Sequence, residues 1–280
     1  MGEMAEDRIY ADRREKTDVY VGSALGLTLV AVSDDRVGRF RLRRRGAIRD
    51  VATGDGVVLI ATDGDVYLST NDGESFEAMG FGPAVAVGFD GDPIAADPDG
   101  AVARFAVAAD EWHQLGGVDD ARAIDRGWLA AGDGVYRIDD EDLEHTGLTS
   151  ARNVAAGETV LAANADGIHR YADGEWACER AVDVHAVASD GARAHAVGPD
   201  GLYEYGNGGE RENDGEREWT RREPPIDEPI VDVGYAGGIV AVTDAGTILV
   251  DPAASKDGAE GWRTRSLGLE DVSGLAVADQ

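Results

Sequence analysis

Short apolar stretches alternate with polar turns along the whole chain, and one phrase recurs. The phrase is an apolar stretch, a turn ending in glycine and a second alternating stretch, as in LIATDGDVYL at residues 59–68. Its glycine recurs seven times at intervals of 33 to 45 residues, at Gly26, Gly64, Gly100, Gly134, Gly167, Gly201 and Gly246. Aspartate precedes five of the seven glycines. Because both central residues of a type I′ turn have positive φ, Asp-Gly predicts such a hairpin in each unit.

Two further features repeat in step with these glycines. A short apolar segment lies about fourteen residues before most of them, and an aromatic residue usually follows nine to eighteen residues after. Each unit therefore predicts four short strands, which is the blade of a β-propeller. No stretch has a convincing helical period, which disfavours an α/β fold. We predict an all-β fold, a seven-bladed β-propeller of four-stranded antiparallel blades.

The first unit lacks its innermost strand, because the residues before Asp18 are mostly charged. Beyond Trp262 the chain still has EDVSGLAVAD at residues 270–279, which resembles the innermost-strand phrase of the other units. We expect this C-terminal strand to close the N-terminal blade and to tie the ends of the ring together, so that no blade edge is left open there. The alternative is that Ile9, Tyr10 and Ala11 supply the strand.

The same pattern sets the domain organisation. We expect a charged N-terminal tail at residues 1–16 and a single propeller domain at 17–280, with a mobile insertion at about 206–218. Apolar runs are too short for a membrane-spanning helix, and the opening residues lack the apolar core of a secretory signal. These features favour a cytoplasmic protein with no membrane partner, which we expect to be a monomer.

The net charge is the most informative feature of the composition. The chain has 55 acidic against 26 basic residues, a formal net charge of −29, and all basic residues except Lys16 and Lys256 are arginines. The acids are spread along the chain, at roughly one net negative charge per 400 Å² of surface. Such repulsion is largely screened only in molar salt, which favours adaptation to a salt-rich cytoplasm. The alternative is an acidic protein with a basic partner. The charge also disfavours general nucleic-acid binding.

One turn resembles a known motif. The segment STNDGESF at residues 69–76 is similar to the Asp-box of sialidase-like propellers. The matching positions are Ser69, Asn71, Gly73, Ser75 and Phe76. The resemblance implies a structural turn in which the Asx side chain binds backbone amides and the aromatic ring packs inside the blade. It implies no sialidase activity, because the Arg-Ile-Pro element of those enzymes does not occur here.

Seven arginines lie between residues 36 and 49. Arg39, Arg41 and Arg43 alternate with Phe40 and Leu42, so a strand would place three guanidinium groups on one face. We interpret this stretch, extended by the following Arg44 and Arg45, as a candidate dock for an acidic partner, a phosphate or a nucleic-acid end. The alternative is an outer strand whose edge is protected by charge and whose arginines pair with nearby acids.

The innermost strands of a propeller line its channel, and aligning them brings polar residues to one mouth. One level holds Arg49, Arg122 and Arg152. The next level holds Asp50, Asn153, His185, Asp232 and Asp271. Such convergence would suit a small anion, water or another ligand. The alternative is that these groups pair with one another and with ordered water.

No catalytic or metal-binding pattern stands out. The five histidines show no metal-ligand spacing, and a single cysteine, Cys178, excludes a cysteine-cluster zinc site. The acidic turns complete no EF-hand loop, and phosphate-binding, dinucleotide-binding and nucleophile-elbow motifs do not occur. We therefore predict no metal, no cofactor and no catalytic residue.

The opening DRIYADRREKTDVYV, the seven-fold repeat and the acidic composition resemble an uncharacterised β-propeller family of halophilic archaea. The resemblance implies a fold and a habitat but no activity. We expect a non-enzymatic cytoplasmic propeller that acts as a protein-interaction platform, because propellers present rigid faces with binding residues on loops. One alternative is a propeller that binds a small anion or ligand at the channel mouth. Another is a hydrolase or lyase with carboxylates on its top-face loops.

Overall fold

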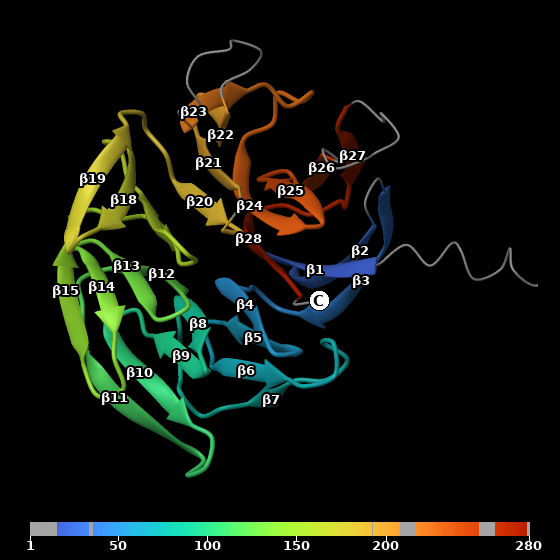
Figure 1. Cartoon of the computed structure of the whole chain (residues 1–280). Helices are drawn as coiled ribbons and strands as arrows, with labels where there is room; N and C mark the ends of the chain where they lie inside the picture. Colours follow the sequence, from blue (N-terminus) through green and yellow to red (C-terminus); the bar gives the residue numbers. More distant parts are fainter. Residues whose placement is uncertain (1–15, 34–35, 192, 208–216, 252–260, 279–280) are drawn as a thin grey trace, which may run out of the picture.

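Seven four-stranded antiparallel sheets stand around a central axis like the blades of a propeller (Figure 1). The computed structural model describes residues 16–33, 36–191, 193–207, 217–251 and 261–278, and within these ranges it contains 28 strands and no helix. The predicted seven-bladed all-β propeller is therefore confirmed. The expected tail lies outside the described residues up to position 15, while Lys16 already begins the first strand.

The blades are numbered in chain order, and the strands of each run from the innermost outward. Blade 1 holds β28 (Val272–Val277), β1 (Lys16–Ser23), β2 (Gly26–Ser33) and β3 (Arg36–Arg45), and blade 2 holds β4 (Asp50–Gly54), β5 (Val57–Ala61), β6 (Val66–Ser69) and β7 (Glu77–Ala78). Blade 3 holds β8 (Ala86–Asp90), β9 (Asp92–Ala96), β10 (Ala101–Ala106) and β11 (Glu111–Gly117), and blade 4 holds β12 (Ala121–Asp125), β13 (Trp128–Ala131), β14 (Val135–Ile138) and β15 (Leu143–Gly147).

The second half of the ring repeats the same order. Blade 5 holds β16 (Asn153–Ala155), β17 (Val160–Ala163), β18 (Ile168–Ala172) and β19 (Glu175–Arg180). Blade 6 holds β20 (Ala186–Ser189), β21 (Ala194–Gly198), β22 (Gly201–Asn207) and β23 (Arg217–Arg222). Blade 7 holds β24 (Ile230–Ala236), β25 (Gly238–Thr243), β26 (Thr247–Asp251) and β27 (Arg263–Ser266). The expected insertion at 206–218 overlaps the ends of β22 and β23, and its centre lies outside the described residues.

The C-terminal strand closes the ring, as the sequence predicts. β28 pairs antiparallel with β1, with Tyr20 opposite Ala276 and Val19 opposite Val277. It takes the innermost place in blade 1, next to β24 and β4 of the flanking blades (Figure 1). The alternative strand at residues 9–11 lies outside the described residues.

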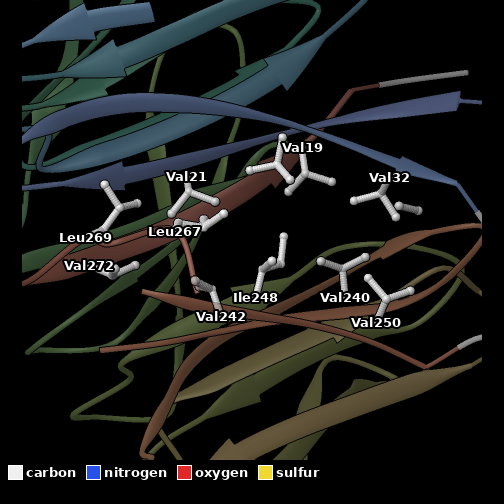
Figure 2. Close-up of a cluster of buried hydrophobic side chains, with 12 residues drawn as sticks. Val19, Val21, Val32, Val240, Val242, Ile248, Val250, Leu267, Leu269 and Val272 are labelled. Carbon is white, nitrogen blue, oxygen red and sulfur yellow. The ribbon is translucent and has the colours of Figure 1, made fainter. Parts of the chain in front are cut away.

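Small apolar side chains fill the spaces between blades. The seven apolar clusters of the described residues each lie between two neighbouring blades. Figure 2 shows the cluster of blades 1 and 7, in which Val19, Val21 and Val32 face Val240 and Ile248. Alternation along each strand sends successive residues toward the two neighbouring blades, so each sheet is buried on both faces near the axis. This packing gives the rigid wall on which the candidate sites are built.

The repeated glycine turns differ in type from the prediction. Type I′ turns require positive φ at both central residues, and neither Gly64 nor the aspartate before it has positive φ. The first residue of the turn closes it instead, since the Thr62 hydroxyl accepts from the amides of Gly64 and Asp65. Two-residue turns with positive φ at both positions occur between the first and second strands of a blade, as at Asp55-Gly56, and between the third and fourth strands, as at Asp173-Gly174.

Candidate functional site

A cavity of ≈ 1010 Å³ occupies the axis of the ring and is lined by the innermost strand of every blade. It includes the turns between the first and second strands, represented by Asp55, Gly91, Arg126 and Gly237. Because the innermost strands run in parallel around the axis, these turns all lie at one end of the channel. The cavity extends from these turns along the innermost strands as far as Asp50, Asn153 and Asp232.

The wall of this cavity is acidic. Six carboxylates line it, from Asp50, Asp55, Asp90, Asp125, Asp190 and Asp232, against the two guanidinium groups of Arg126 and Arg193. Arg193 is already engaged, since it forms an ion pair with Asp190 and donates to the Gly237 carbonyl. An anion entering this cavity would meet a surplus of negative charge, which disfavours an anion site there.

Three predicted channel residues hold equivalent places in their strands and bridge neighbouring blades. The Asp50 carboxylate accepts from the Val87 amide at 2.9 Å. The Asn153 amide oxygen accepts from the Val187 amide at 3.1 Å, and the Asp232 carboxylate accepts from the Leu275 amide at 2.8 Å. Each bond runs from one innermost strand to the next one around the ring. These side chains therefore satisfy backbone groups that the gap between blades would leave unpaired.

A second set of hydrogen bonds between neighbouring blades comes from side chains one position before the level of Asp50, Asn153 and Asp232. The Arg122 guanidinium donates to the Ala151 carbonyl at 2.9 Å, and the Arg152 guanidinium donates to the Val184 carbonyl at 3.1 Å. His185 makes the equivalent contact with the Ile230 carbonyl at 3.0 Å. The sequence pattern predicts His185 at the level of Asp50, and this prediction was wrong by one residue, because His185 lies at the level of Arg152.

The arginines of this set also pair with carboxylates. Arg49 forms two hydrogen bonds with Asp63, at 2.7 and 2.9 Å, and this contact lowers the pKa of Asp63. Arg122 pairs with Asp120, and Arg152 pairs with Asp183 at 2.5 Å. Five of the predicted channel residues do not line the cavity, namely Arg49, Arg122, Arg152, His185 and Asp271.

Asp271 lies elsewhere than expected. It is exposed, has a φ of 51° and precedes β28, and its carbonyl accepts from the Ala24 amide. Gly274 takes the place in blade 1 that Asp50 takes in blade 2. A Cβ there would lie 3.0 Å from an Asp232 carboxylate oxygen, so the close approach of Asp232 favours glycine.

Two of the bridging carboxylates hold their protons more tightly than usual. Burial raises the pKa of Asp50 to about 7, while the amides of Val87 and Val51 oppose the shift and the charge of Asp232 adds to it. Burial likewise raises the pKa of Asp232 to about 6. Raised carboxylate pKa values can mark catalytic acids, but a structural network shifts them as well. Here both carboxylates already accept backbone bonds across blade boundaries.

The predicted arginine strand is β3, the outermost strand of blade 1. Arg39, Arg41 and Arg45 are exposed, and among the described residues none of the three contacts a carboxylate within ion-pair distance. Arginines of the other blades contrast with them, because many pair with a carboxylate of the chain. Examples are Arg49–Asp63, Arg104–Asp90, Arg137–Glu144, Arg170–Glu179 and Arg222–Glu204.

Arg43 and Arg44 do not join this exposed group. The register between β2 and β3 shifts between Leu27 and Thr28, which places both arginines beside blade 2. The Arg44 guanidinium lies 3.7 Å from the centre of the Tyr67 ring. Arg43 is largely buried and lies 3.8 Å from Glu74. The expected single face of three guanidinium groups is thus interrupted by a β-bulge, which sequence alternation alone does not reveal.

The turn at residues 69–76 is closed by its own side chains. The Ser69 hydroxyl accepts from the Gly73 amide at 3.0 Å, and the Asn71 side-chain oxygen accepts from the Ser75 amide at 3.0 Å. Phe76 packs against the apolar cluster between blades 1 and 2. The turn therefore lies beside the face of β3 that is turned toward blade 2, where Arg43 approaches Glu74.

The described residues offer little for metal or membrane chemistry. They contain no group of three or more histidine, cysteine, aspartate or glutamate side chains that could hold a metal ion. No helix long and apolar enough to cross a membrane occurs among them either. Cys178 is exposed and forms no disulfide.

Sequence reasoning missed two exposed arginines beside the arginine strand. Arg263 and Arg265 lie on β27, and Arg265 donates to the carbonyls of Val37 and Gly38 in blade 1. Arg265 also lies over the Phe40 ring. The alternation in RTRS was the available signal, but the contact between β27 and β3 depends on the closure of the ring.

The comparison with family models decides the family. The model described as "Beta-prop_HVO_0234:-like, beta propeller" matches residues 3–278. The chain belongs to this family. No curated protein matches the chain significantly. The family assignment and the seven observed blades agree on the fold, and neither carries an activity.

Solved structures support the same architecture at low sequence identity. The chain is similar to a structure titled as a nidogen/laminin complex (11% identity, 94% of this chain and 98% of that chain, TM-score 0.57). It is also similar to the computationally designed Ika8 protein (16% identity, 92% and 86%, TM-score 0.59). A third is the extracellular domain of the putative hybrid two-component system BT4673 from B. thetaiotaomicron (12% identity, 82% and 37%, TM-score 0.58). At these identities the likeness concerns the fold alone.

Proposed function

We propose that this propeller is a non-enzymatic protein-interaction platform whose binding surface includes the outer strand β3. One observation carries the proposal. Arg39, Arg41 and Arg45 are exposed, and no carboxylate of the described residues neutralises them, in a chain with a net charge of −29. A guanidinium group that remains unpaired among so many acids is available for an external carboxylate.

The channel supports the proposal by contrast. Its polar residues make bonds between blades, so Asp50, Asn153 and Asp232 have a structural role that needs no ligand. The acidic wall gives no support to the anion-binding alternative, and no contact among the described residues favours the hydrolase or lyase alternative. The outer strand therefore remains the better-supported surface.

Three simultaneous substitutions test this surface. The variant R39Q/R41Q/R45Q should lose a stoichiometric partner that copurifies with the parent protein from native cells in molar KCl. Because these side chains make no ion pair with described residues, the melting temperature should stay within a few degrees of the parent. The matched control R137Q/R170Q/R193Q removes arginines that are paired within the chain. It should retain the partner, and retention of the partner by both variants would refute the platform surface.

Further sequence-based predictions accompany this proposal. The acidic surface suits a salt-rich cytoplasm, where screening weakens repulsion between like charges. The turn at residues 69–76 serves as an Asp-box-like structural turn, supported by its internal hydrogen bonds. We also propose a cytoplasmic location, a monomeric state, no cofactor and no general nucleic-acid binding.

A further inference from the structure

We infer that the seam between blades 7 and 1 is a receptor for an extended acidic protein segment, with Arg265 as its anchor. The inference rests on the proposed function, because it names the partner chemistry of the surface that β3 begins. The seam is formed where β27 contacts β3. It brings Phe40 of blade 1 together with Arg263 and Arg265 of blade 7, which lie opposite Val250 and Ile248 on the side of blade 7 that faces blade 1.

Arg265 is the one seam arginine of the described residues whose guanidinium is fixed on two sides. Its Nη1 donates to the Val37 carbonyl at 3.2 Å and to the Gly38 carbonyl at 2.5 Å. The guanidinium carbon lies 5.0 Å from the centre of the Phe40 ring. Nε and Nη2 make no bond with any described residue, so two donors are held in place without a partner in that part of the chain.

That geometry suits a carboxylate. A guanidinium group binds a carboxylate through two parallel N–H bonds, and a fixed orientation reduces the entropy lost on binding. Arg263 is exposed, lies on the same face of β27 as Arg265 and, among the described residues, bonds only the Gly261 carbonyl. Successive carboxylates of one extended segment can therefore meet both Arg263 and Arg265 along the seam.

Phe40 supplies the apolar part of the surface. Its side chain is 39% exposed, which makes it one of few large hydrophobic side chains of the described residues that remain open to solvent. An apolar side chain between two carboxylates of the partner would cover the free part of this ring. Aromatic and arginine side chains together are typical of residues that dominate binding energy.

Charge complementarity favours a short acidic protein segment over a nucleic acid. The arginines of β3 and β27 lie on the outer strands of two blades, while the chain as a whole is strongly acidic. A duplex with one negative charge per about 1.7 Å would extend beyond the arginines onto repelling carboxylates. A segment of a few residues fits the seam without reaching them.

A labelled hexapeptide of alternating glutamate and leucine provides the probe, with fluorescence anisotropy in 2 M KCl as the readout. The parent protein should bind it at least tenfold more tightly than the matched peptide with glutamine in place of glutamate. A labelled twelve-nucleotide thymidine strand should bind more weakly than the acidic peptide. Equal binding of the two peptides, or tighter binding of the nucleic acid, would overturn the inference.

Variants separate the anchor from general charge. R265K keeps the positive charge but loses the planar fork, and it should weaken binding of the acidic peptide about tenfold. R263Q and F40A should each weaken it severalfold, while R137Q, an exposed but paired arginine, should leave it unchanged. Melting temperatures of all variants establish that they are folded. Unchanged peptide affinity in folded R265K would refute the anchor.

The two proposals can fail separately. Suppose that R39Q/R41Q/R45Q loses the natural partner but the acidic peptide binds no better than its glutamine counterpart. The receptor proposed at the seam is then refuted, while the proposed interaction surface on β3 is supported. Suppose instead that R265K weakens binding of the acidic peptide but R39Q/R41Q/R45Q retains the natural partner. The proposed interaction surface on β3 is then refuted, while the receptor at the seam is supported.

Discussion

Single polar side chains of the innermost strands hold the blades to one another. Asp50, Asn153 and Asp232 occupy equivalent positions and make the same bond to the next strand around the ring. Asn153 shows that a neutral amide makes the bond between blades, although Asp50 also accepts from the Val51 amide through its second oxygen. The charge of Asp50 is thus not needed for the bridge, and burying it is unfavourable.

Replacing Asp50 by asparagine should stabilise the protein at high pH. Burial raises the pKa of Asp50 to about 7, above its unfolded value, so ionisation is costlier in the folded state. The parent protein therefore loses stability from this group as the pH rises from about 4 through 7, and D50N does not. In thermal and denaturant melts, the stability of D50N relative to the parent should increase by about 2 kcal/mol between pH 5 and pH 8.

An exposed aspartate serves as the control. Asp63 has a lowered pKa because Arg49 binds it, so D63N removes a favourable contact and should show no gain at pH 8. A D50N protein that follows the parent at every pH would mean that the Asp50 carboxylate stays hydrated in the channel.

Among the strands, the C-terminal β28 is held from three directions. It pairs with β1, its Leu275 amide donates to Asp232 of blade 7, and its Val277 carbonyl accepts from the Thr53 hydroxyl of blade 2 at 2.6 Å. Without β28, blade 1 would lose its innermost strand and β1 would present an open edge. The strand therefore joins the two ends of the ring.

Deleting residues 271–280 should cause aggregation or a markedly lower melting temperature, because the deletion removes these contacts and exposes apolar cluster residues of blades 7 and 1. Circular dichroism melts and size-exclusion chromatography measure both effects. Deleting residues 1–6, which precede the first described strand, should change little. Equal stability of the C-terminal truncation and the parent would refute closure by β28.

Strands are easier to predict from this sequence than side-chain partners are. The recurrent glycine phrase and the DVSGLAV segment indicate seven blades and the closing strand, because repetition and alternation directly reflect strand packing. The bulge that moves Arg43 beside blade 2 depends on local register, and the Arg265 contact depends on ring closure. Asp271 was misplaced because the true equivalent, Gly274, has no side chain to align.

Across the propeller as a whole, polar groups divide into two sets. Those around the axis bond neighbouring blades or line an acidic cavity, whereas β3 and β27 on the outer rim carry exposed arginines without carboxylate partners among the described residues. The net charge of −29 makes this rim unusual within the chain. Partner binding is therefore expected on the rim of blades 7 and 1 and away from the channel.

Hydrogen exchange of the partner-bound protein, compared with the free protein, is the decisive measurement of where the partner binds. Binding on the rim should slow amide exchange in β3 and β27, while exchange in the turns around the cavity, such as Asp55-Gly56 and Arg126-Gly127, stays as it is in the free protein. Protection confined to those turns, with β3 and β27 unchanged, would place the partner at the channel and contradict binding on the rim.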